Sequence, residues 1–325
     1  MSGIKIAVVT GPTATGKTRL AVHLAEKFNG EVVSADSRQV YRHLDIGSGK
    51  DIAEYGDVPH HLIDIVDPGA EYHLKAFCTD ARAAISDIAA RGRFPVVCGG
   101  STLYIHALLK GYELPGAAPD PAERARLDAS SLDELQTRLR SIDPEFYENF
   151  ADRDNFNRLR RAIEIRSSCA VPAAATAPAV SDEPEFDALV LGVLFPRSVV
   201  RERIRQRLDA RLEQGLIEEV RSLHERYAMS WEKLEFLGLE YRFVAEYLQG
   251  RTQYDEMREL LLNHIRQFAK RQDIFFRKME REGVAIHWIN EGKFEPAAAL
   301  TADFIAGKPL PAPEFRLMDF RNPAK

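Results

Sequence analysis

An eight-residue segment near the start of the chain has the composition of a phosphate-binding loop. It reads GPTATGKT from Gly11 to Thr18, matches the pattern G-x-x-x-x-G-K-[ST], and lies between a strand-like and a helix-like run. Its glycines allow backbone N–H groups to converge on phosphate oxygens, and the following helix adds the positive end of its dipole. Lys17 would supply a positive charge, and Thr18 would ligate Mg²⁺. This pattern predicts a phosphate site but leaves kinases, NTPases and other pyrophosphate chemistries open.

A carboxylate, Asp36, follows the second strand-like run of the chain. In an open α/β sheet the carboxyl ends of the strands border the ligand crevice, so Asp36 should point toward phosphates bound by Lys17. A carboxylate there could hold Mg²⁺ through water, or it could take a proton from an attacking nucleophile. The remaining interpretation is an aspartate that caps a turn.

Two glycines and a hydroxyl side chain close another strand-like run. Gly99 and Gly100 permit a close approach of the backbone to a ligand, and Ser101 could then donate a hydrogen bond to a phosphate oxygen or to a reacting amine. The alternative is an ordinary glycine turn in which Ser101 caps the next helix.

Three arginines recur at helical spacing in the second half of the chain. Arg203, Arg207 and Arg211 fall at i, i+4 and i+8, which is one helical face, and Ile204 and Leu208 form a neighbouring apolar stripe. If this helix packs beside the phosphate loop, one or two of the guanidinium groups could clamp a diphosphate bidentately. The alternative is a row of solvated salt bridges.

An α/β scaffold is needed to bring these residues together. Up to about residue 113, short β-rich runs alternate with helical runs, which is typical of a parallel sheet with crossover helices. We therefore predict a P-loop NTPase-like parallel sheet flanked by helices, with an all-helical insertion domain. The predicted strands are 4–10, 31–36, 94–100, 187–195 and 284–290, and the predicted early helices are 19–28, 79–92 and 102–111.

Four segments follow from this pattern. Residues 1–114 should form the first part of the P-loop core, and residues 115–185 a helical insertion. Residues 114–150 have no strand signal, and the insertion ends in a low-complexity Ala/Pro stretch at 170–185. Residues 186–307 should complete the core with long helices and a late strand, and residues 308–325 should form an irregular tail.

The composition fits an enzyme of a reducing compartment. The chain has 325 residues, 45% of them hydrophobic, which is enough to bury a core, and no apolar run approaches the roughly 20 residues of a membrane helix. Its three cysteines, Cys78, Cys98 and Cys169, are widely spaced and odd in number, which argues against a disulfide framework and a zinc ribbon and favours the cytoplasm.

The overall charge argues against a general polyanion binder. The net charge is -5 at pH 7, yet arginines concentrate at 153–166, 197–211 and 266–281. Such clusters could form a local basic surface on an otherwise acidic protein, or they could be solvated helix faces.

The chain resembles the tRNA dimethylallyltransferases, also called tRNA isopentenyltransferases, in six ordered blocks. The blocks are GPTATGKT, SADSRQVYRHLDIGSGKD, PHHLIDIVDP, VCGGSTLY, RERIRQRLDARLEQGLIEEV and RQFAKRQDIFFRK. The D-S-x-x-V-Y-R-x-x-D-I-G and A-K-R-Q blocks are much more specific than the phosphate loop, and the match runs through nearly the whole chain.

This resemblance implies a reaction in which the phosphate is discarded. The family transfers a dimethylallyl group from dimethylallyl diphosphate to N6 of the adenosine adjoining the tRNA anticodon, and it releases pyrophosphate. The phosphate loop would then hold a leaving group and not ATP. An adenine amine is a poor nucleophile because its lone pair is delocalised into the ring, so the enzyme must align it and remove its proton. We expect a monomer that requires Mg²⁺ and binds the anticodon stem-loop of tRNA.

The resemblance also implies roles for individual residues. Asp36 would be the general base, and Ser101 stands where the family usually has a threonine that positions the amine. Either Arg203 or Arg207 would act with Lys17 on the charge of the departing pyrophosphate, and Arg203 is the favoured candidate. The diphosphate would be bound by Gly11, Pro12, Thr13, Ala14, Thr15, Gly16, Lys17, Thr18 and Arg207, with the metal on Thr18. The helical insertion at 115–185 would contact tRNA. The residues in contact with tRNA would be Asp36, Ser37, Gln39, Arg158, Arg161, Lys270, Arg271 and Gln272.

Two features of the resemblance stay open. An aromatic side chain should stack on the target base, but spacing does not distinguish Tyr41, Tyr104 and Phe268. The chain also departs from the family pattern, since Leu239 stands where relatives often have tyrosine and Asp51 where they usually have proline.

Three other functions compete with this interpretation. A nucleotide-directed prenyltransferase would modify AMP, ADP or ATP. The basic segment RQFAKRQ argues against this function, because a mononucleotide acceptor needs no extended basic surface. A small-molecule P-loop kinase would bind ATP and use Asp36 for Mg²⁺, although no arginine-rich lid is recognisable between two strands. A non-catalytic tRNA-binding homologue would not need Lys17, Thr18, Asp36 and the hydroxyl of Ser101.

Overall fold

The structure, a computed structural model, describes residues 3–113, 120–167, 179–180 and 185–319. The chain divides into two compact units, which are described separately here. One comprises Met1–Leu109 with Pro184–Lys325, and the other comprises Lys110–Glu183. Because both ends of the second unit join the first, the core is discontinuous in sequence.

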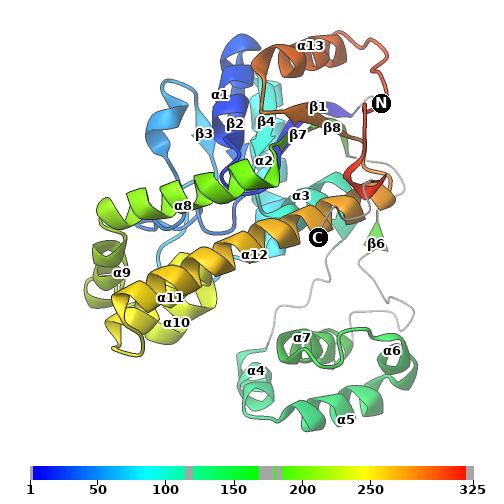
Figure 1. Ribbon diagram of the computed structural model, residues 1–325. Helices are drawn as coiled ribbons and strands as arrows, with labels where there is room; N and C mark the ends of the chain where they lie inside the picture. Colours follow the sequence, from blue (N-terminus) through cyan, green and yellow to red (C-terminus); the bar gives the residue numbers. More distant parts are fainter. Residues whose placement is uncertain (1–2, 114–119, 168–178, 181–184, 320–325) are drawn as a thin grey trace. The chain divides into compact units, whose positions relative to one another are not determined.

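A six-stranded parallel sheet forms the centre of the larger unit, in the order β3-β2-β4-β1-β7-β8 (Figure 1). Its predicted strands are confirmed as β1 (Ile4–Thr10), β2 (Gly30–Ser34), β4 (Phe94–Cys98), β7 (Phe186–Leu194) and β8 (Ile286–Asn290). The central strand β1 is fully buried from Ile6 to Val9, as expected for a parallel strand covered on both faces. Strand β3 (His60–His61) was not predicted, because two residues are too few to show an alternating pattern.

Helices connect and cover these strands. The predicted early helices are confirmed as α1 (Lys17–Lys27), α2 (Leu74–Ala90) and α3 (Thr102–Leu109). A further helix, α13 (Phe294–Ile305), packs with α1 on the same apolar cluster of the sheet. The P-loop-like α/β fold predicted from the sequence is therefore confirmed.

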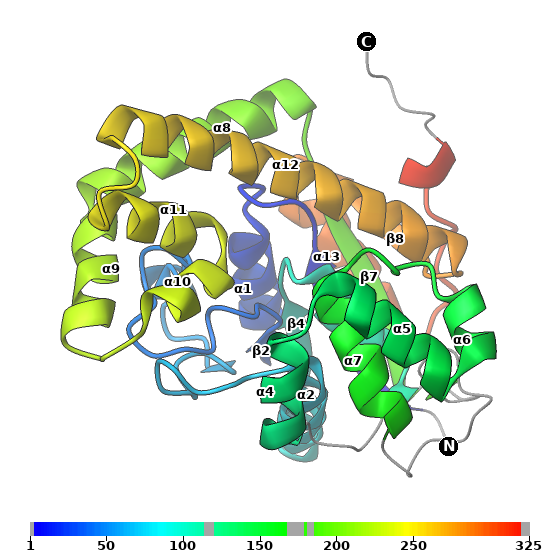
Figure 2. The same cartoon turned by 90° about the horizontal axis from the view of Figure 1, so that it is seen from below.

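The long helical section after β7 consists of five helices, which pack into one apolar cluster. They are α8 (Arg197–Glu213), α9 (Leu216–Glu225), α10 (Trp231–Leu237), α11 (Leu239–Leu248) and α12 (Tyr254–Arg281). Gly215 and Gly238, both at positive φ, separate successive helices. Helices α8 and α12 lie side by side (Figures 1 and 2), so their facing side chains can enclose ligand sites.

The smaller unit has its own apolar core of buried leucine, isoleucine and tyrosine side chains. Its helices are α4 (Pro121–Asp128), α5 (Leu132–Ile142), α6 (Pro144–Asn149) and α7 (Phe156–Ser167). Ser131 and Glu134 form a capping box at the start of α5, as expected of a serine followed three residues later by glutamate.

The insertion at 115–185 was expected to be all-helical, but it includes one short strand. A two-residue strand β6 (Ala179–Val180) pairs antiparallel with β5 (Tyr112–Glu113). Such a short pairing depends on backbone hydrogen bonds and leaves no pattern in an Ala/Pro-rich sequence. Residues 168–178, which include Cys169, and residues 181–184 lie outside the described residues.

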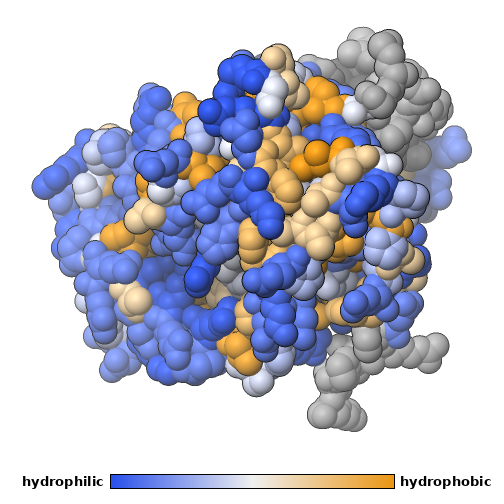
Figure 3. Space-filling view, turned by 90° about the horizontal axis from the view of Figure 1, so that it is seen from above, coloured by the Kyte–Doolittle hydropathy of each residue, from blue (hydrophilic) through white to orange (hydrophobic). Residues whose placement is uncertain are grey.

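The tail was expected to be irregular. Most of residues 308–319 are irregular, but the tail includes the short helix η2 (Leu317–Asp319). Glu280 of α12 anchors this turn, because its carboxylate accepts hydrogen bonds from the backbone N–H groups of Leu317 at 3.0 Å and Met318 at 2.8 Å. The face in Figure 3 is mostly hydrophilic, with apolar residues in smaller groups. No helix within the described residues is both long and apolar enough to cross a membrane.

Candidate active site

A cavity lies at the carboxyl ends of the central strands, where the sequence placed the phosphate site. The phosphate loop, the Asp36 turn, the glycines after β4, and helices α8, α11 and α12 all contribute to its wall. The wall includes Thr13, Lys17, Thr18, Asp36, Arg38, Gln39, Gly49, Gly100, Arg207, Arg211, Leu239, Glu240, Ile265, Phe268 and Gln272. Residues separated by more than 200 positions in the sequence therefore meet around one space.

The phosphate loop is held in shape by its own hydrogen bonds. The backbone oxygen of Pro12 accepts the Thr15 hydroxyl at 2.8 Å and the Lys17 ammonium at 2.8 Å. A Cβ on Gly11 would come within 2.6 Å of the Val193 oxygen in β7, so this position requires glycine. The loop thus packs against the sheet, and the Lys17 side chain lies over the backbone of the loop.

The environment of Lys17 favours the binding of an anion. Burial, assisted by the nearby charge of Arg207, lowers the pKa of Lys17 from 10.5 to about 8, although Cys98 and Asp36 act in the opposite direction. A bound diphosphate would replace the lost solvation of the ammonium group and raise this pKa again. Burial also raises the pKa of the Cys98 thiol to about 12, which keeps this cysteine neutral.

Asp36 caps a turn with one carboxylate oxygen and also faces the cavity. Its Oδ1 accepts the backbone N–H of Arg38 at 2.9 Å and that of Gln39 at 3.4 Å. Its Oδ2 makes no hydrogen bond with any described residue, and the side chain is part of the cavity wall. The turn-capping interpretation therefore holds for one oxygen and leaves the other free for chemistry.

Ser101 is not part of the cavity wall, unlike the two glycines before it. Its Oγ accepts the backbone N–H of Ser37 at 3.0 Å. This bond fixes the loop after Asp36 to the end of β4. In the structure Ser101 therefore holds the Asp36 turn in place.

The three predicted arginines of α8 do not behave alike. Arg207 and Arg211 reach the cavity wall, and Arg207 also donates to Asp51 Oδ2 at 2.8 Å. Arg203 is outside the wall, and its guanidinium lies 3.9 Å from the centre of the Phe195 ring. The preference for Arg203 over Arg207 is therefore not supported by this geometry, because only the later turns of α8 face the cavity.

Glu240 organises two of the arginines around the cavity. This carboxylate, 3% exposed, accepts from Arg38 at 2.8 Å and from Arg211 at 2.9 Å. Burial and the neighbouring Arg207 lower the pKa of Arg211 to about 10. The charged side chains in the wall are four cations (Lys17, Arg38, Arg207, Arg211) and two anions (Asp36, Glu240), so the wall carries a net charge of +2 that suits a polyanion.

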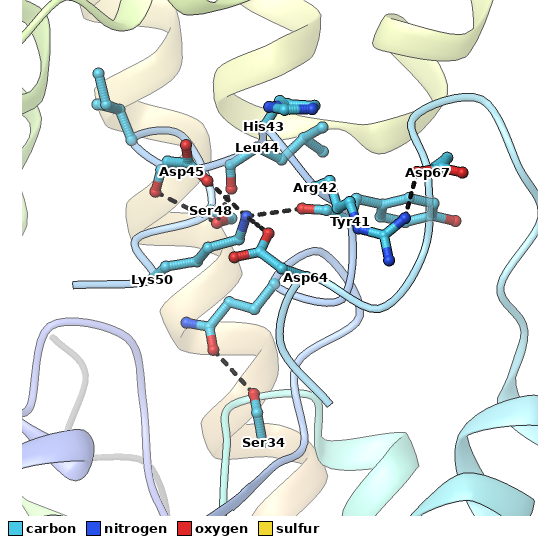
Figure 4. Close-up of polar contacts among 12 residues, drawn as sticks. Ser34, Tyr41, Arg42, His43, Leu44, Asp45, Ser48, Lys50, Asp64 and Asp67 are labelled. Carbon is cyan, nitrogen blue, oxygen red and sulfur yellow. Dashed lines mark hydrogen bonds and ion pairs between the residues drawn. The ribbon is translucent and has the colours of Figure 1, made fainter. Parts of the chain in front are cut away.

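A buried lysine positions the loop that faces these arginines (Figure 4). Lys50, only 2% exposed, donates to the Tyr41 backbone oxygen at 2.7 Å, to Asp45 Oδ1 at 2.6 Å, and to Asp64. The adjacent Gly49 has a φ of +66°, and a Cβ there would collide with the guanidinium groups of Arg207 and Arg211. The block SADSRQVYRHLDIGSGKD therefore folds into a loop that brings a bare backbone up to two arginines.

Two glutamines predicted to contact tRNA are engaged inside the protein. Gln272, 3% exposed, accepts the Thr13 N–H at 2.9 Å and donates to the Gly100 oxygen at 2.8 Å. Gln39 accepts the Ser34 hydroxyl at 2.9 Å and donates to the Gly49 oxygen at 3.0 Å. Gln272 thus ties α12 to the phosphate loop, a role that the sequence pattern did not indicate.

The basic residues predicted to contact tRNA differ in their surroundings. Lys270 and Arg271 on α12 are exposed, and neither forms an ion pair with a described residue. In the smaller unit, Arg158 pairs with Asp152 at 2.5 Å and Arg161 pairs with Glu164 at 3.0 Å.

Part of the cavity wall is apolar. Phe268 contributes to it, whereas the other two aromatic candidates, Tyr41 and Tyr104, are buried elsewhere. Leu239 and Ile265 add aliphatic surface, and Leu239 adopts a φ of +45°, a conformation that is costly for a bulky residue. Of the three aromatic candidates, Phe268 is therefore the one in the wall, which also includes the buried Tyr55.

The oxygen ligands in the wall fit a magnesium ion that also binds a phosphate. No group of three or more His, Cys, Asp or Glu side chains suited to a metal occurs in the part of the chain that the structure describes. Thr18 and Asp36 are both in the wall, and Mg²⁺ commonly uses one or two protein oxygens together with phosphate oxygens and water. The donor set suits Mg²⁺ bound with a diphosphate.

Known proteins resemble the chain over most of its length. Residues 39–279 match the model of a family described as IPP transferase, and residues 4–55 match that of isopentenyl transferase. A relative from Citrifermentans bemidjiense, named tRNA dimethylallyltransferase 2, is 46% identical over 291 residues, which cover 90% of this chain and 92% of the relative.

Solved structures show the same similarity. The tRNA isopentenylpyrophosphate transferase of Bacillus halodurans is 32% identical with a TM-score of 0.66, over 93% of this chain and 96% of that one. A eukaryotic dimethylallyltransferase solved while acting on tRNA is 26% identical with a TM-score of 0.82, over 94% of this chain and 81% of that one.

Proposed function

The chain belongs to the IPP transferase family, and on that premise we propose that it transfers a dimethylallyl group from dimethylallyl diphosphate to tRNA. The acceptor is N6 of the adenosine adjoining the anticodon, and pyrophosphate leaves. The observation that supports this best is the single cavity in which a phosphate loop, a free carboxylate oxygen and an apolar wall meet. The wall thus has a cationic part for a diphosphate, a carboxylate oxygen that can accept a proton, and an apolar part for a prenyl group.

The diphosphate is bound at the cationic part of the wall. Backbone N–H groups of the loop, Lys17, Arg207 and Arg211 stabilise the charge that develops on the leaving pyrophosphate. A Mg²⁺ held by Thr18 and the diphosphate would supply further electrostatic stabilisation of the leaving oxygen. Gln272 keeps the loop in position from α12.

The acceptor and the prenyl group occupy the remaining wall. Leu239 and Ile265 contact the five-carbon group, and Phe268 stacks on the adenine ring. The N6 lone pair forms a bond to the allylic carbon, the bond from that carbon to the diphosphate oxygen breaks, and the N6 proton passes to Asp36. The base must leave its stack to reach this site, which costs least in a single-stranded anticodon loop.

The RNA is held by basic side chains beyond the cavity. The exposed Lys270 and Arg271 contact phosphates, and Arg158 and Arg161 of the smaller unit add contacts once they exchange their carboxylate partners. We propose that the enzyme works as a cytoplasmic monomer.

A product assay tests this proposal. The purified protein is incubated with Mg²⁺, dimethylallyl diphosphate and unmodified anticodon stem-loop RNA, with AMP or ATP in parallel tubes, and the products are weighed by mass spectrometry. We expect one C5H8 unit on the RNA adenosine and none on AMP. Transfer to AMP alone identifies a nucleotide-directed enzyme, RNA binding without transfer identifies a non-catalytic binder, and consumption of ATP identifies a kinase.

A further inference from the structure

A second cavity lies between α8, α12 and the tail, and it shares no lining residue with the active site. Its volume is roughly 460 Å³. The two cavities are formed by opposite parts of the same elements. Val200 and Ile204 of α8 and Lys270 of α12 face the second cavity, whereas Arg207 and Gln272 face the first. The second space is therefore a separate potential site.

The floor of this cavity is apolar and includes two phenyl rings. It is formed by Pro12, Leu194, Phe195, Val200, Ile204, Ala269, Phe315 and Leu317. Pro12 belongs to the phosphate loop, so the floor borders the back of the active site. Such a surface gains free energy when an apolar group displaces water from it.

The rim of the cavity is strongly cationic. It carries Arg197, Arg201, Arg266, Lys270 and Arg277, and of the described residues that line the cavity only Asp273 is acidic. No ion pair joins Arg197, Arg201, Arg266 or Lys270 to another described residue, although Arg197 interacts electrostatically with Asp273 and Arg266 with Glu202. By contrast, Arg205 on the same helix α8 pairs with Glu202 and Asp209. The rim therefore holds cations that remain available to an anion.

Two polar features of the rim lack partners as well. The Nε of Arg266 is buried, and no described residue accepts a hydrogen bond from it. Helix α8 starts at the cavity with Arg197, and its first turn has neither a side-chain cap nor an acidic residue. The free N–H groups and positive dipole end of a helix both favour a bound anion, so they add to the charge of the guanidinium groups.

We propose that this cavity binds an amphiphile with a diphosphate head and an aliphatic tail, of the class of prenyl diphosphates longer than five carbons. The head lies among Arg197, Arg201 and Arg266, and the tail covers the apolar floor. A five-carbon tail leaves most of that floor exposed to water. An RNA phosphate could use the same cations, but a largely aliphatic and phenyl floor offers little to the polar edge of a nucleobase.

Binding of farnesyl diphosphate tests this proposal by calorimetry, with inorganic pyrophosphate and dimethylallyl diphosphate as comparison ligands. The Lys17→Ala variant removes the charge of the active-site loop, and the Arg201→Glu/Arg266→Glu variant reverses two charges of the second rim. Arg205→Ala is the matched control, because Arg205 is exposed on α8 but outside the cavity. Ala269→Leu fills the floor without a change of charge, and thermal unfolding confirms that each variant is folded.

We expect Lys17→Ala to weaken dimethylallyl diphosphate at least tenfold and to leave a farnesyl diphosphate site intact. Arg201→Glu/Arg266→Glu should weaken farnesyl diphosphate at least tenfold and spare dimethylallyl diphosphate. Ala269→Leu should weaken farnesyl diphosphate without an effect on pyrophosphate, and Arg205→Ala should change neither ligand.

Two results would overturn the proposal. One is loss of all farnesyl diphosphate binding in Lys17→Ala together with full binding in the rim variant, which places the ligand in the active site. The other is farnesyl diphosphate that binds the second rim no more tightly than pyrophosphate, which makes the rim an anion-binding part of the RNA surface. Neither result bears on transfer to tRNA, so failure here is separate from failure of the proposed function.

Discussion

Replacement of Lys17 by methionine should make the unliganded protein more stable and unable to bind a diphosphate tightly. A pKa lowered from 10.5 to about 8 corresponds to at most about 3 kcal/mol against the folded state, since one pKa unit equals about 1.4 kcal/mol. The lost hydrogen bond from Lys17 to the Pro12 oxygen offsets roughly 1.5–3 kcal/mol of this. The Pro12 oxygen keeps its bond from Thr15, so it is not left unsatisfied. We expect a net gain of about 1 kcal/mol.

The pH dependence of this gain has a definite sign. Below about pH 8 Lys17 is charged in both the folded and the unfolded chain, and the folded state carries the full cost. Between about pH 8 and 10.5 the folded state loses the proton first, so the wild-type protein gains stability with rising pH relative to the variant. The stability advantage of Lys17→Met should therefore shrink above pH 8 and change sign before pH 10.5, because the recovered cost exceeds the net gain.

Chemical denaturation at pH 7, 8, 9 and 10 measures this difference. Lys27→Met is the matched control, because Lys27 is an exposed lysine of the same helix. Saturating pyrophosphate with Mg²⁺ should stabilise the wild type and the control but not Lys17→Met. A Lys17→Met protein that is less stable than wild type, with a gap that does not change with pH, would refute the reasoning about this cavity.

Four further changes test individual parts of the site. Asp36→Ala should lower the transfer rate by about 10²–10⁴ while diphosphate binding persists, and equal losses in both would move Asp36 to the metal. Arg207→Ala should weaken the diphosphate far more than Arg203→Ala in the same titration, and the reverse order would contradict the observed cavity wall. Gln272→Leu should raise KM for dimethylallyl diphosphate and leave the Kd for stem-loop RNA unchanged; a loss of RNA affinity alone would restore its assignment to the RNA surface. Lys270→Ala should lower the slope of RNA affinity against salt by about 0.7–0.9 per phosphate contact, and an unchanged slope excludes such a contact.

Local sequence patterns were sufficient for the parts of the site that lie at strand ends. The phosphate loop and Asp36 each follow a strand of the parallel sheet, and such strands end at the same edge. Their meeting therefore follows from strand order and register alone. The five longer strands were predicted for the same reason, since each is a short apolar run bounded by turn residues.

The helical side of the site could not be predicted in this way. The spacing of Arg203, Arg207 and Arg211 is uniform, so only the path of α8 across the cavity decides which of them reach it. Arg211 was part of the pattern but was not assigned to the site. Glu240 was not assigned either, because its role depends on two arginines that are remote in sequence. Gln272 was assigned to RNA because it matches the A-K-R-Q region of the family, although its side chain is buried.

The stoichiometry of phosphate release decides whether the phosphate loop holds a leaving group. Pyrophosphate and orthophosphate are quantified together with the C5H8 gained by stem-loop RNA, in a reaction with Mg²⁺ and dimethylallyl diphosphate but no ATP. We expect one pyrophosphate per modified adenosine, no orthophosphate, and loss of both products in Lys17→Met. A requirement for ATP, or release of orthophosphate in step with transfer, would contradict it.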